Sequence, residues 1–293
     1  MSKRFVSNCM LILTAMIWGF AFVAQKDASS YIGSFTFNGI RFMLGSLSLI
    51  PVILIFERDG LKDKERVMRT LKYGIITGIV LFCASTLQQF GVVMITHASK
   101  AGFITGLYTI LVPIFGIFMG KKTSANTWIG AFLAVIGLYM VSVIGAPTVE
   151  FGDLLILIGA IFWAFHIIAI DKFVDKVNTI QYSSIQFLTC SAINLILMLV
   201  FELHSFSMAN IFSAGVSILY AGIMSSGVAY TLQVVGQKHA EPTKAAIIFS
   251  LESVFCCVGC MLILGDTMTL TALIGCTLIL AGIILSQLEF EKK

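Results

Sequence analysis

The sequence predicts an all-α membrane protein, with ten transmembrane helices arranged as two inverted five-helix repeats. The first observation behind this prediction is composition. The 293 residues are 58% hydrophobic and 12% charged, with a mean hydropathy of +0.98, whereas charged residues make up about a quarter of soluble domains. A helix needs roughly 20 apolar residues to cross a hydrocarbon core of about 30 Å. In the strands of a membrane β-barrel, apolar side chains facing lipid alternate with polar side chains facing the lumen. The long, uninterrupted apolar runs of this sequence therefore favour helices.

The second observation is an internal duplication. Residues 145 positions apart match along five consecutive apolar segments, with a one-residue slip near Lys100 and Lys244. Such a register indicates two copies of one unit. We assign residues 1–145 to the first copy and 146–293 to the second. The matching segments include Trp18 with Trp163, Thr86-Leu87-Gln88 with Thr231-Leu232-Gln233, Lys100-Ala101-Gly102 with Lys244-Ala245-Ala246, Gly120 with Gly265, Gly130 with Gly275 and Gly137 with Gly282.

Apolar runs place five spans in each copy. They cover residues 5–25, 34–56, 71–92, 98–119 and 125–145, and then 152–171, 181–202, 213–236, 243–264 and 269–287. The longest connection, Glu57 to Lys72, alternates in charge and is predicted to be a solvated cap. Lys3 and Arg4 before an apolar run also fit a cleaved secretory signal, but the first span has a counterpart around Trp163, which favours a permanent span.

Lysine and arginine residues accumulate on cytoplasmic loops of membrane proteins. With the N-terminus inside, sixteen of the nineteen lie on the cytoplasmic side; the exceptions are Lys26, Arg41 and Lys100. We therefore expect a multi-pass protein of a bacterial-type inner membrane with both termini cytoplasmic.

An odd number of spans per copy makes the second copy enter the membrane from the opposite side. Inverted repeats create a pseudo-two-fold axis in the membrane plane, and a site at their junction can open to either face. This geometry favours a carrier.

Several segments resemble the EamA-type transporters of the drug/metabolite transporter superfamily, over residues 10–287. In the first copy they are Ala15-Met16-Ile17-Trp18-Gly19-Phe20, Ile40-Arg41-Phe42 and Leu111-Val112-Pro113-Ile114-Phe115 before Gly120-Lys121; in the second, Ser250-Leu251-Glu252-Ser253-Val254-Phe255 and Leu264-Gly265-Asp266. The chain departs from the family pattern at Ser253, where proline is frequent, and at Asp266 and Lys121, where the pattern has glutamate. The resemblance implies transport of amino acids, amines or other small organic compounds, often outward.

Ionisable side chains inside a span cost about 2.5–3.5 kcal/mol on insertion scales and usually face a cavity or a partner. Glu252 and Arg41 each lie about eight residues into a span, near mid-membrane. In one interpretation Glu252 lines a central cavity, where it binds an amine or carries a coupling proton, and Arg41 holds a substrate carboxylate. In the other they form a structural ion pair, or hydroxyls such as those of Ser250 and Ser253 cap the glutamate.

Aromatic and polar side chains complete the predicted substrate site. Trp18 and Trp163 occupy equivalent repeat positions and are expected to form apolar or cation–π walls, or simply to pack. His166 shares a helix face with Trp163 and is either a core histidine or a proton carrier. Tyr108, at the repeat position of Glu252, and Gln88 and Gln233 offer hydrogen bonds to a substrate or to neighbouring helices.

Glycines indicate close helix contacts. Gly130 with Gly137, and Gly275 with Gly282, give the fifth and tenth spans matching small faces, which suit either a peripheral position or a dimer contact. Pro113 lacks an N–H and is expected to kink the fourth span.

Other classes of function have less support. His166 and Asp171 form a His-x-x-x-x-Asp pattern used by lipid acyltransferases, and Cys257-x-x-Cys260 resembles a redox or metal pair, but neither has further parts of a site around it. A channel or a membrane scaffold would lack alternating access.

We therefore expect a secondary active transporter, not an enzyme, that moves an amino acid, amine or similar metabolite, driven by protons or by exchange. The alternative within the same fold is an organic cation or drug exporter. No cofactor, metal or nucleic acid is expected, and the protein is expected to be a monomer or homodimer in the lipid bilayer.

Overall fold

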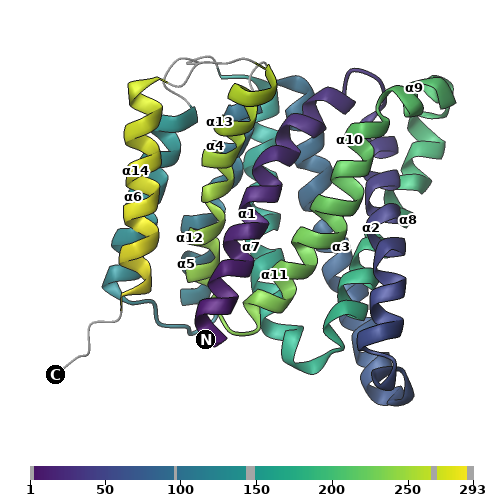
Figure 1. Cartoon of the computed structure of the whole chain (residues 1–293), viewed down its shortest axis with the longest axis horizontal. Coiled ribbons are helices and arrows are strands. Elements are labelled where there is room, and N and C mark those ends of the chain that lie inside the picture. The colour runs from purple at the N-terminus through teal and green to yellow at the C-terminus, as the bar shows by residue number, and fades with distance from the viewer. Residues whose placement is uncertain (1–2, 96–97, 143–148, 265–268, 289–293) are drawn as a thin grey trace.

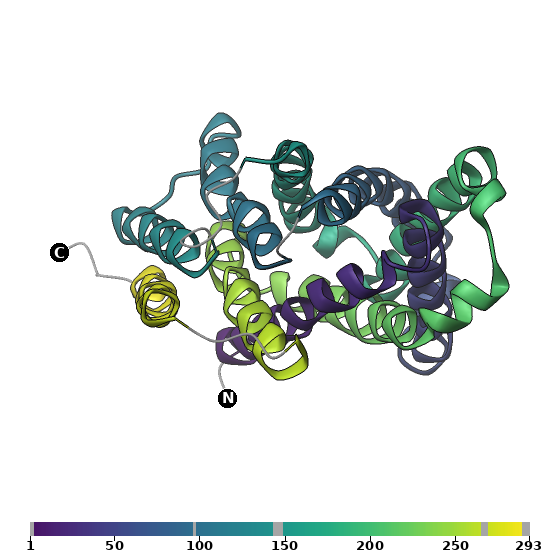
Figure 2. The same cartoon turned by 90° about the horizontal axis from the view of Figure 1, so that it is seen from above.

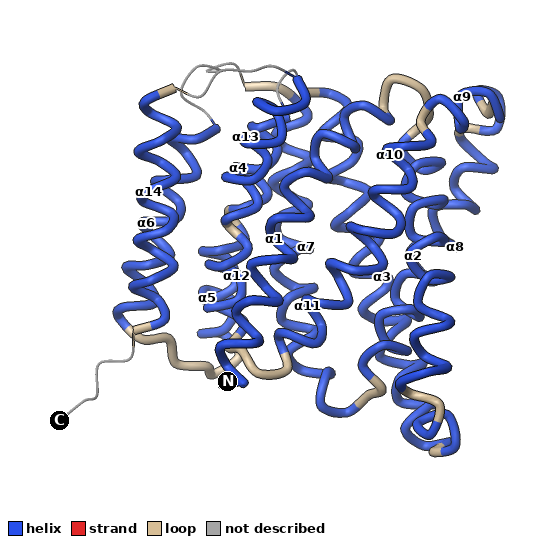
Figure 3. Tube along the Cα trace, viewed as in Figure 1, coloured by secondary structure: helices blue, strands red, loops and turns tan. Residues whose placement is uncertain are grey.

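A computed structural model describes residues 3–95, 98–142, 149–264 and 269–288. Helices make up these segments almost entirely, and no strand occurs within the described ranges (Figure 3). The first copy contains α1 (Lys3–Ala28), α2 (Ser34–Phe56), η1 (Asp59–Lys62), α3 (Lys64–Met94), α4 (Ala98–Gly106), α5 (Tyr108–Phe118) and α6 (Ala125–Ser142). The second contains α7 (Phe151–Phe173), η2 (Val174–Lys176), α8 (Thr179–Phe201), η3 (Leu203–Ser205), α9 (Met208–Ser213), α10 (Gly215–Leu219), η4 (Tyr220–Ala229), α11 (Tyr230–Gln237), α12 (Pro242–Phe249), α13 (Leu251–Gly259), η5 (Cys260–Leu264) and α14 (Leu270–Gln287).

The ten predicted spans are confirmed. Within the described residues nine helical runs are long and apolar enough to cross a membrane, and α6 is a tenth, shorter apolar helix. Continuous runs combine α4 with α5, α10 with η4 and α11, and α12 with α13. Large apolar side chains such as Phe118 (83% exposed) and Leu262 (74% exposed) point outward, while polar side chains are buried inside. This distribution suits a lipid environment, where apolar surface faces hydrocarbon.

The two ends of the bundle are antiparallel helix pairs, each built from one helix of each copy (Figures 1 and 2). At one end α6 packs on α14. A Cβ added at Gly130 would lie 2.5 Å from the carbonyl oxygen of Gly282, and one added at Gly137 would lie 2.5 Å from that of Gly275. Each glycine thus contacts the repeat equivalent of the other, as a pseudo-two-fold axis requires. The small faces expected from the sequence hold the two copies together inside one chain.

At the other end α2 packs on α8, and two carboxylates cap the pair reciprocally. Glu57, directly after α2, accepts from the backbone N–H groups of Ile180 and Gln181 at 3.0 Å each, in the first turn of α8. Glu202, directly after α8, accepts from those of Phe35 (2.9 Å) and Thr36 (2.8 Å), in the first turn of α2. The first N–H groups of a helix have no intrahelical acceptor, so each copy satisfies the other's helix start.

Some local predictions need correction. The segment Glu57 to Lys72 is not a loop throughout, because α3 begins at Lys64, where the Asp63 carboxylate accepts from the N–H of Arg66 at 3.0 Å. The fourth span is interrupted at Leu107, which was not predicted, and Pro113 lies inside α5. The first span agrees with the prediction: α1 is part of the bundle and packs on α11, α13 and η4. Gly265 and Asp266 lie outside the described residues.

Candidate functional site

Two interrupted helices meet at the centre of the molecule. The run α4–α5 breaks at Leu107, whose N–H donates to the carbonyl of Ile104 at 3.3 Å. The run α12–α13 breaks at Ser250, whose N–H donates to that of Ile247 at 3.2 Å. These bonds span three residues instead of four, which tightens the turn. Discontinuous spans in equivalent positions of inverted repeats are the usual location of a transporter's binding site.

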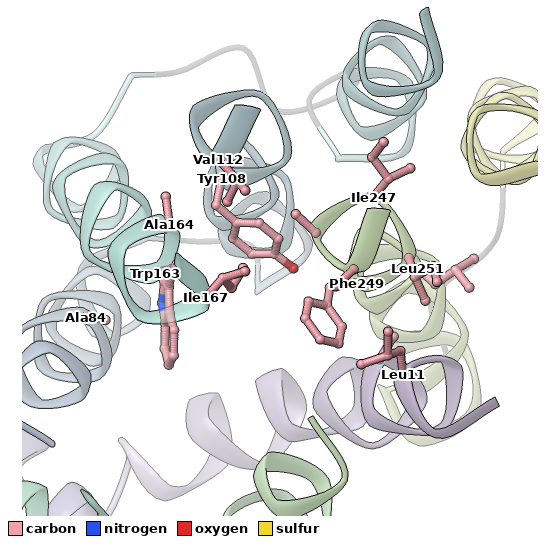
Figure 4. Packing of buried hydrophobic residues seen from close by; sticks show 14 of the residues in the cluster. Leu11, Ala84, Tyr108, Val112, Trp163, Ala164, Ile167, Ile247, Phe249 and Leu251 are labelled. Carbon is pink, nitrogen blue, oxygen red and sulfur yellow. The ribbon is translucent and has the colours of Figure 1, made fainter. Parts of the chain in front are cut away.

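Directly after each break lies one polar side chain, and the two meet where the two copies join. Tyr108 follows the first break, Glu252 the second, and the Tyr108 hydroxyl donates to Oε1 of Glu252 at 2.9 Å. Both residues are buried, at 3% and 4% exposure. Figure 4 shows the Tyr108 hydroxyl pointing from its helix into the space between Trp163 and Ile167 on one side and Phe249 on the other. Ser253 does not prevent the break, although the related family often has proline there.

Aromatic side chains from both copies surround this pair. Tyr230 lies between the two tryptophans, with ring centroids 4.7 Å from Trp18 and 6.0 Å from Trp163. Polar partners fix the indoles, since Trp18 Nε1 donates to the carbonyl of Ser225 at 3.4 Å and Trp163 Nε1 to Oε1 of Gln88 at 3.1 Å. The predicted tryptophan walls are therefore oriented by hydrogen bonds as well as by packing.

These groups line a central cavity whose surface is mainly apolar, with a few polar groups. Its lining comprises Trp18, Ala21, Phe22, Gln25, Arg41, Gln88, Thr105, Tyr108, Trp163, Ile167, Ser225, Tyr230, Gln233 and Glu252. Its free volume is about 30 Å³, which is room for about two water molecules. In this conformation the centre is constricted, and a solute fits only if the lining side chains move apart.

Arg41 and Glu252 contribute a guanidinium and a carboxyl group to the same cavity, and no ion pair joins them in the described part of the chain. Arg41 is 2% exposed; its Nε donates to Oδ1 of Asn38 at 2.9 Å, and its guanidinium carbon lies 4.5 Å from the ring centroid of Phe42. The structure therefore does not contain the structural ion pair between Arg41 and Glu252 that was one of the two interpretations.

Two amide oxygens in the cavity wall have no hydrogen-bond donor among the described residues. They are Oε1 of Gln25 and Oε1 of Gln233, on side chains that are 4% and 1% exposed. A buried acceptor without a donor costs free energy, so a donor group that reached either oxygen after the lining side chains moved apart would relieve this cost.

His166 is the one predicted site residue that does not line the cavity. It is fully buried, and its Nε2 lies 2.9 Å from Oε1 of Gln186. Asp171 instead forms an ion pair with Lys121. The pattern His166-x-x-x-x-Asp171 therefore does not form a base with its orienting carboxylate.

Among the described residues, no group of three or more histidine, cysteine or acidic side chains is arranged to hold a metal ion. No disulfide joins any two of the cysteines that the structure describes. The Cys257-x-x-Cys260 motif is thus not a disulfide here.

Among the polar and aromatic lining residues, sequence reasoning missed Phe22, Gln25, Thr105 and Ser225. Two of them carried a readable signal. Gln25 lies seven residues after Trp18 and so shares its helix face, and Thr105 lies one turn before Tyr108. Ser225 lies inside the π-helical η4, whose wider turn has no signal in the amino-acid pattern.

Known proteins match this architecture along the whole chain. The model of the EamA-like transporter family matches twice, over residues 6–143 and 150–288. An uncharacterized transporter of Archaeoglobus fulgidus is 29% identical over 293 residues, which are 98% of this chain and 87% of the relative. The uncharacterized transporter YoaV of Bacillus subtilis is 20% identical over 289 residues, 97% of each chain.

A solved crystal structure with 17% sequence identity superposes with a TM-score of 0.79 and covers 96% of both chains. This likeness supports the fold. The family model covers nearly all of the sequence, once in each copy, and the matched relatives carry the name of transporters. The chain belongs to the EamA-like transporter family and is a membrane transporter.

Proposed function

We propose that the protein is a secondary active transporter of small zwitterionic metabolites such as amino acids, which cross the membrane through the central cavity by alternating access. The observation that carries this proposal is the pairing of charges in the cavity wall. Arg41 and Glu252 both line it, both are buried, and they do not neutralise each other. A solute carrying an ammonium and a carboxylate group would complement both.

The polar groups around each charge support this orientation. Tyr108 already holds one oxygen of Glu252, and the acceptor oxygens of Gln25 and Gln233 add sites for ammonium N–H groups. Arginine matches a carboxylate bidentately, and Arg41 uses only Nε on Asn38 among the described contacts. The solute carboxylate would therefore lie toward Arg41 and its ammonium group toward Glu252.

The interrupted helices support alternating access. Breaks at Leu107 and Ser250 place the hydrogen-bonded pair Tyr108 and Glu252 between segments that belong to different copies. If the two copies exchange conformations, this junction opens toward one face and then the other. A carboxyl group that is buried when the cavity is closed is also suited to bind and release a coupling proton. Proton coupling and exchange are both consistent with this arrangement.

The test uses the purified protein in proteoliposomes, with uptake and efflux of a panel of amino acids and amines measured with and without a pH gradient. We expect at least one zwitterion to be transported. Glu252→Gln should abolish transport or remove its pH dependence, and Arg41→Gln should abolish transport of zwitterions, both without loss of folded protein. Glu65→Gln, at an exposed position in the first turn of α3, is the matched control.

The result that contradicts the proposal is unchanged zwitterion transport and an unchanged pH profile in Glu252→Gln. Transport of organic cations that survives Arg41→Gln but not Glu252→Gln would favour the cation exporter instead. The aromatic rings around Glu252 are the specific feature that would serve a cation.

A further inference from the structure

A second, wider cavity lies below the central one. It opens between the loop that follows α5, the end of α7 and the loop between α11 and α12, on the face of the molecule that carries the N-terminus (Figure 1). We call it the vestibule. Its free volume is about 480 Å³, against about 30 Å³ in the central cavity. In this conformation the vestibule, and not the centre, has room for a metabolite.

Gln237 forms the boundary between the two cavities. It is the last residue of α11 and lines the vestibule, while Gln233, one turn earlier on the same helix face, lines the centre. The Gln237 Nε2 group donates to the carbonyl of Ile167 at 3.0 Å, and Ile167 also lines the central cavity. This bond ties α11 to α7 at the floor of the centre.

The same bond fixes the direction of the amide. Because the nitrogen must face the Ile167 carbonyl, the Gln237 oxygen faces away from it. Gln237 is 2% exposed, and its Oε1 is enclosed by protein and has no donor among the described residues. With Gln233 Oε1, it forms a pair of unpartnered acceptors separated along the helix by one turn, about 6 Å.

The fold itself does not require an amide at this position. The repeat equivalent of Gln237 in α3 is Val92, 145 residues earlier, an apolar side chain that is fully buried. The duplicated packing is therefore satisfied by valine in one copy. The glutamine occurs only where a wide, charged vestibule adjoins it.

The vestibule carries both signs of charge. Asp171 and Asp175 contribute carboxylates, Lys121 and Lys238 contribute ammonium groups, and Lys121 pairs with Asp171. A lining of this kind offers carboxylates to an ammonium group and ammonium groups to a carboxylate, so a small zwitterion can be accommodated.

We propose that the vestibule is a second binding subsite for small solutes with an ammonium group, and that Gln237 Oε1 recognises this group once the Gln237 side chain turns toward the vestibule. The solute reaches Gln233 and the centre when Gln237 releases Ile167. This inference rests on the proposed function, because it assigns the vestibule to the same class of zwitterion that the centre would take.

The experiment measures binding of glycine, the smallest amino-acid zwitterion, to the full-length protein in detergent by saturation-transfer NMR, which detects weak complexes. All variants are made in a background that combines Glu252→Gln with Arg41→Gln, which removes both groups proposed to bind the solute in the central cavity. In that background we expect glycine to bind, methylammonium to compete and acetate not to compete. Adding Gln237→Val, which introduces the side-chain type found at the equivalent position of the first copy, should reduce the glycine signal at least fivefold.

A second variant separates recognition from folding. Gln237→Glu keeps an acceptor oxygen and the side-chain length, so it should retain glycine binding where Gln237→Val loses it, with size-exclusion profiles matching in both. Equal glycine binding with and without Gln237→Val would overturn the inference. Failure of the proposed function looks different: transport would be absent or insensitive to Glu252→Gln while Gln237-dependent glycine binding persists.

Discussion

Replacing Glu202 by glutamine should destabilise the protein without touching the cavity. Glu202 accepts three hydrogen bonds at the start of α2, from the N–H of Phe35 (2.9 Å) and from the N–H and hydroxyl of Thr36 (2.8 and 2.7 Å). A glutamine retains one acceptor oxygen, so at least one donor in the first turn loses its partner. Hydrogen bonds to charged groups contribute about 1.5–3 kcal/mol, which is the loss we expect.

Thermal unfolding of the purified protein, followed by tryptophan fluorescence, measures this loss. At roughly 2–4 °C per kcal/mol for larger domains, the midpoint should fall by about 3–12 °C. Glu57→Gln should act similarly at the start of α8. The two caps lie at opposite ends of a pair of helices about 35 Å long, so their effects should add.

Glu65→Gln, on the exposed face of α3, is the control and should change stability by less than about 0.5 kcal/mol. If Glu202→Gln is no more destabilising than Glu65→Gln, the reciprocal capping does not stabilise the fold. A strongly non-additive Glu57 and Glu202 double variant would show that the caps are coupled and not independent.

Two further predictions concern packing and the central hydrogen bond. Gly137→Ala places a Cβ 2.5 Å from the backbone oxygen of Gly275 and should lower the unfolding midpoint, whereas Gly215→Ala, with nothing within 4 Å, should not; equal midpoints would refute the close contact of α6 with α14. Tyr108→Phe removes the donor to Glu252, and at about 1–3 kcal/mol for a buried group left without its partner the transport rate should fall roughly 10- to 100-fold in proteoliposomes. A rate within twofold of wild type would show that this bond does not support transport.

The spans and the duplication could be predicted from sequence because they depend on local composition and on register. After the one-residue slip near Lys100 and Lys244, the offset of 144 residues also made Tyr108 the counterpart of Glu252, and the structure joins the two by a hydrogen bond. Inverted repeats bring residues on the pseudo-axis next to their own counterparts, as with Phe42 and Phe187, whose rings lie 6.2 Å apart.

The position of His166 could not be predicted from a shared helix face alone. Relative to Trp163, a residue three positions on is rotated by about 60° in one direction and a residue four positions on by about 40° in the other. Ile167, the fourth, lines the cavity, and His166, the third, turns to Gln186.

The helix breaks and the cap at Glu202 depend on tertiary partners. The breaks at Leu107 and Ser250 occur beside the central cavity, where backbone hydrogen bonds span three residues instead of four, and no proline marks either position. Glu202 accepts a hydrogen bond from the backbone N–H of Thr36, which is 166 residues away in the sequence. Local propensity contains no information about such distant partners.

The most direct test of the account is the transport rate per folded molecule of Glu252→Gln measured beside Glu202→Gln, for whichever zwitterion the wild-type protein carries. Both variants remove one buried or half-buried carboxylate, but only Glu252 lines the cavity shared by the two copies. We predict that Glu252→Gln loses transport or its pH dependence while Glu202→Gln keeps both and loses stability. Equal transport in the two variants would contradict a transport path through the central cavity.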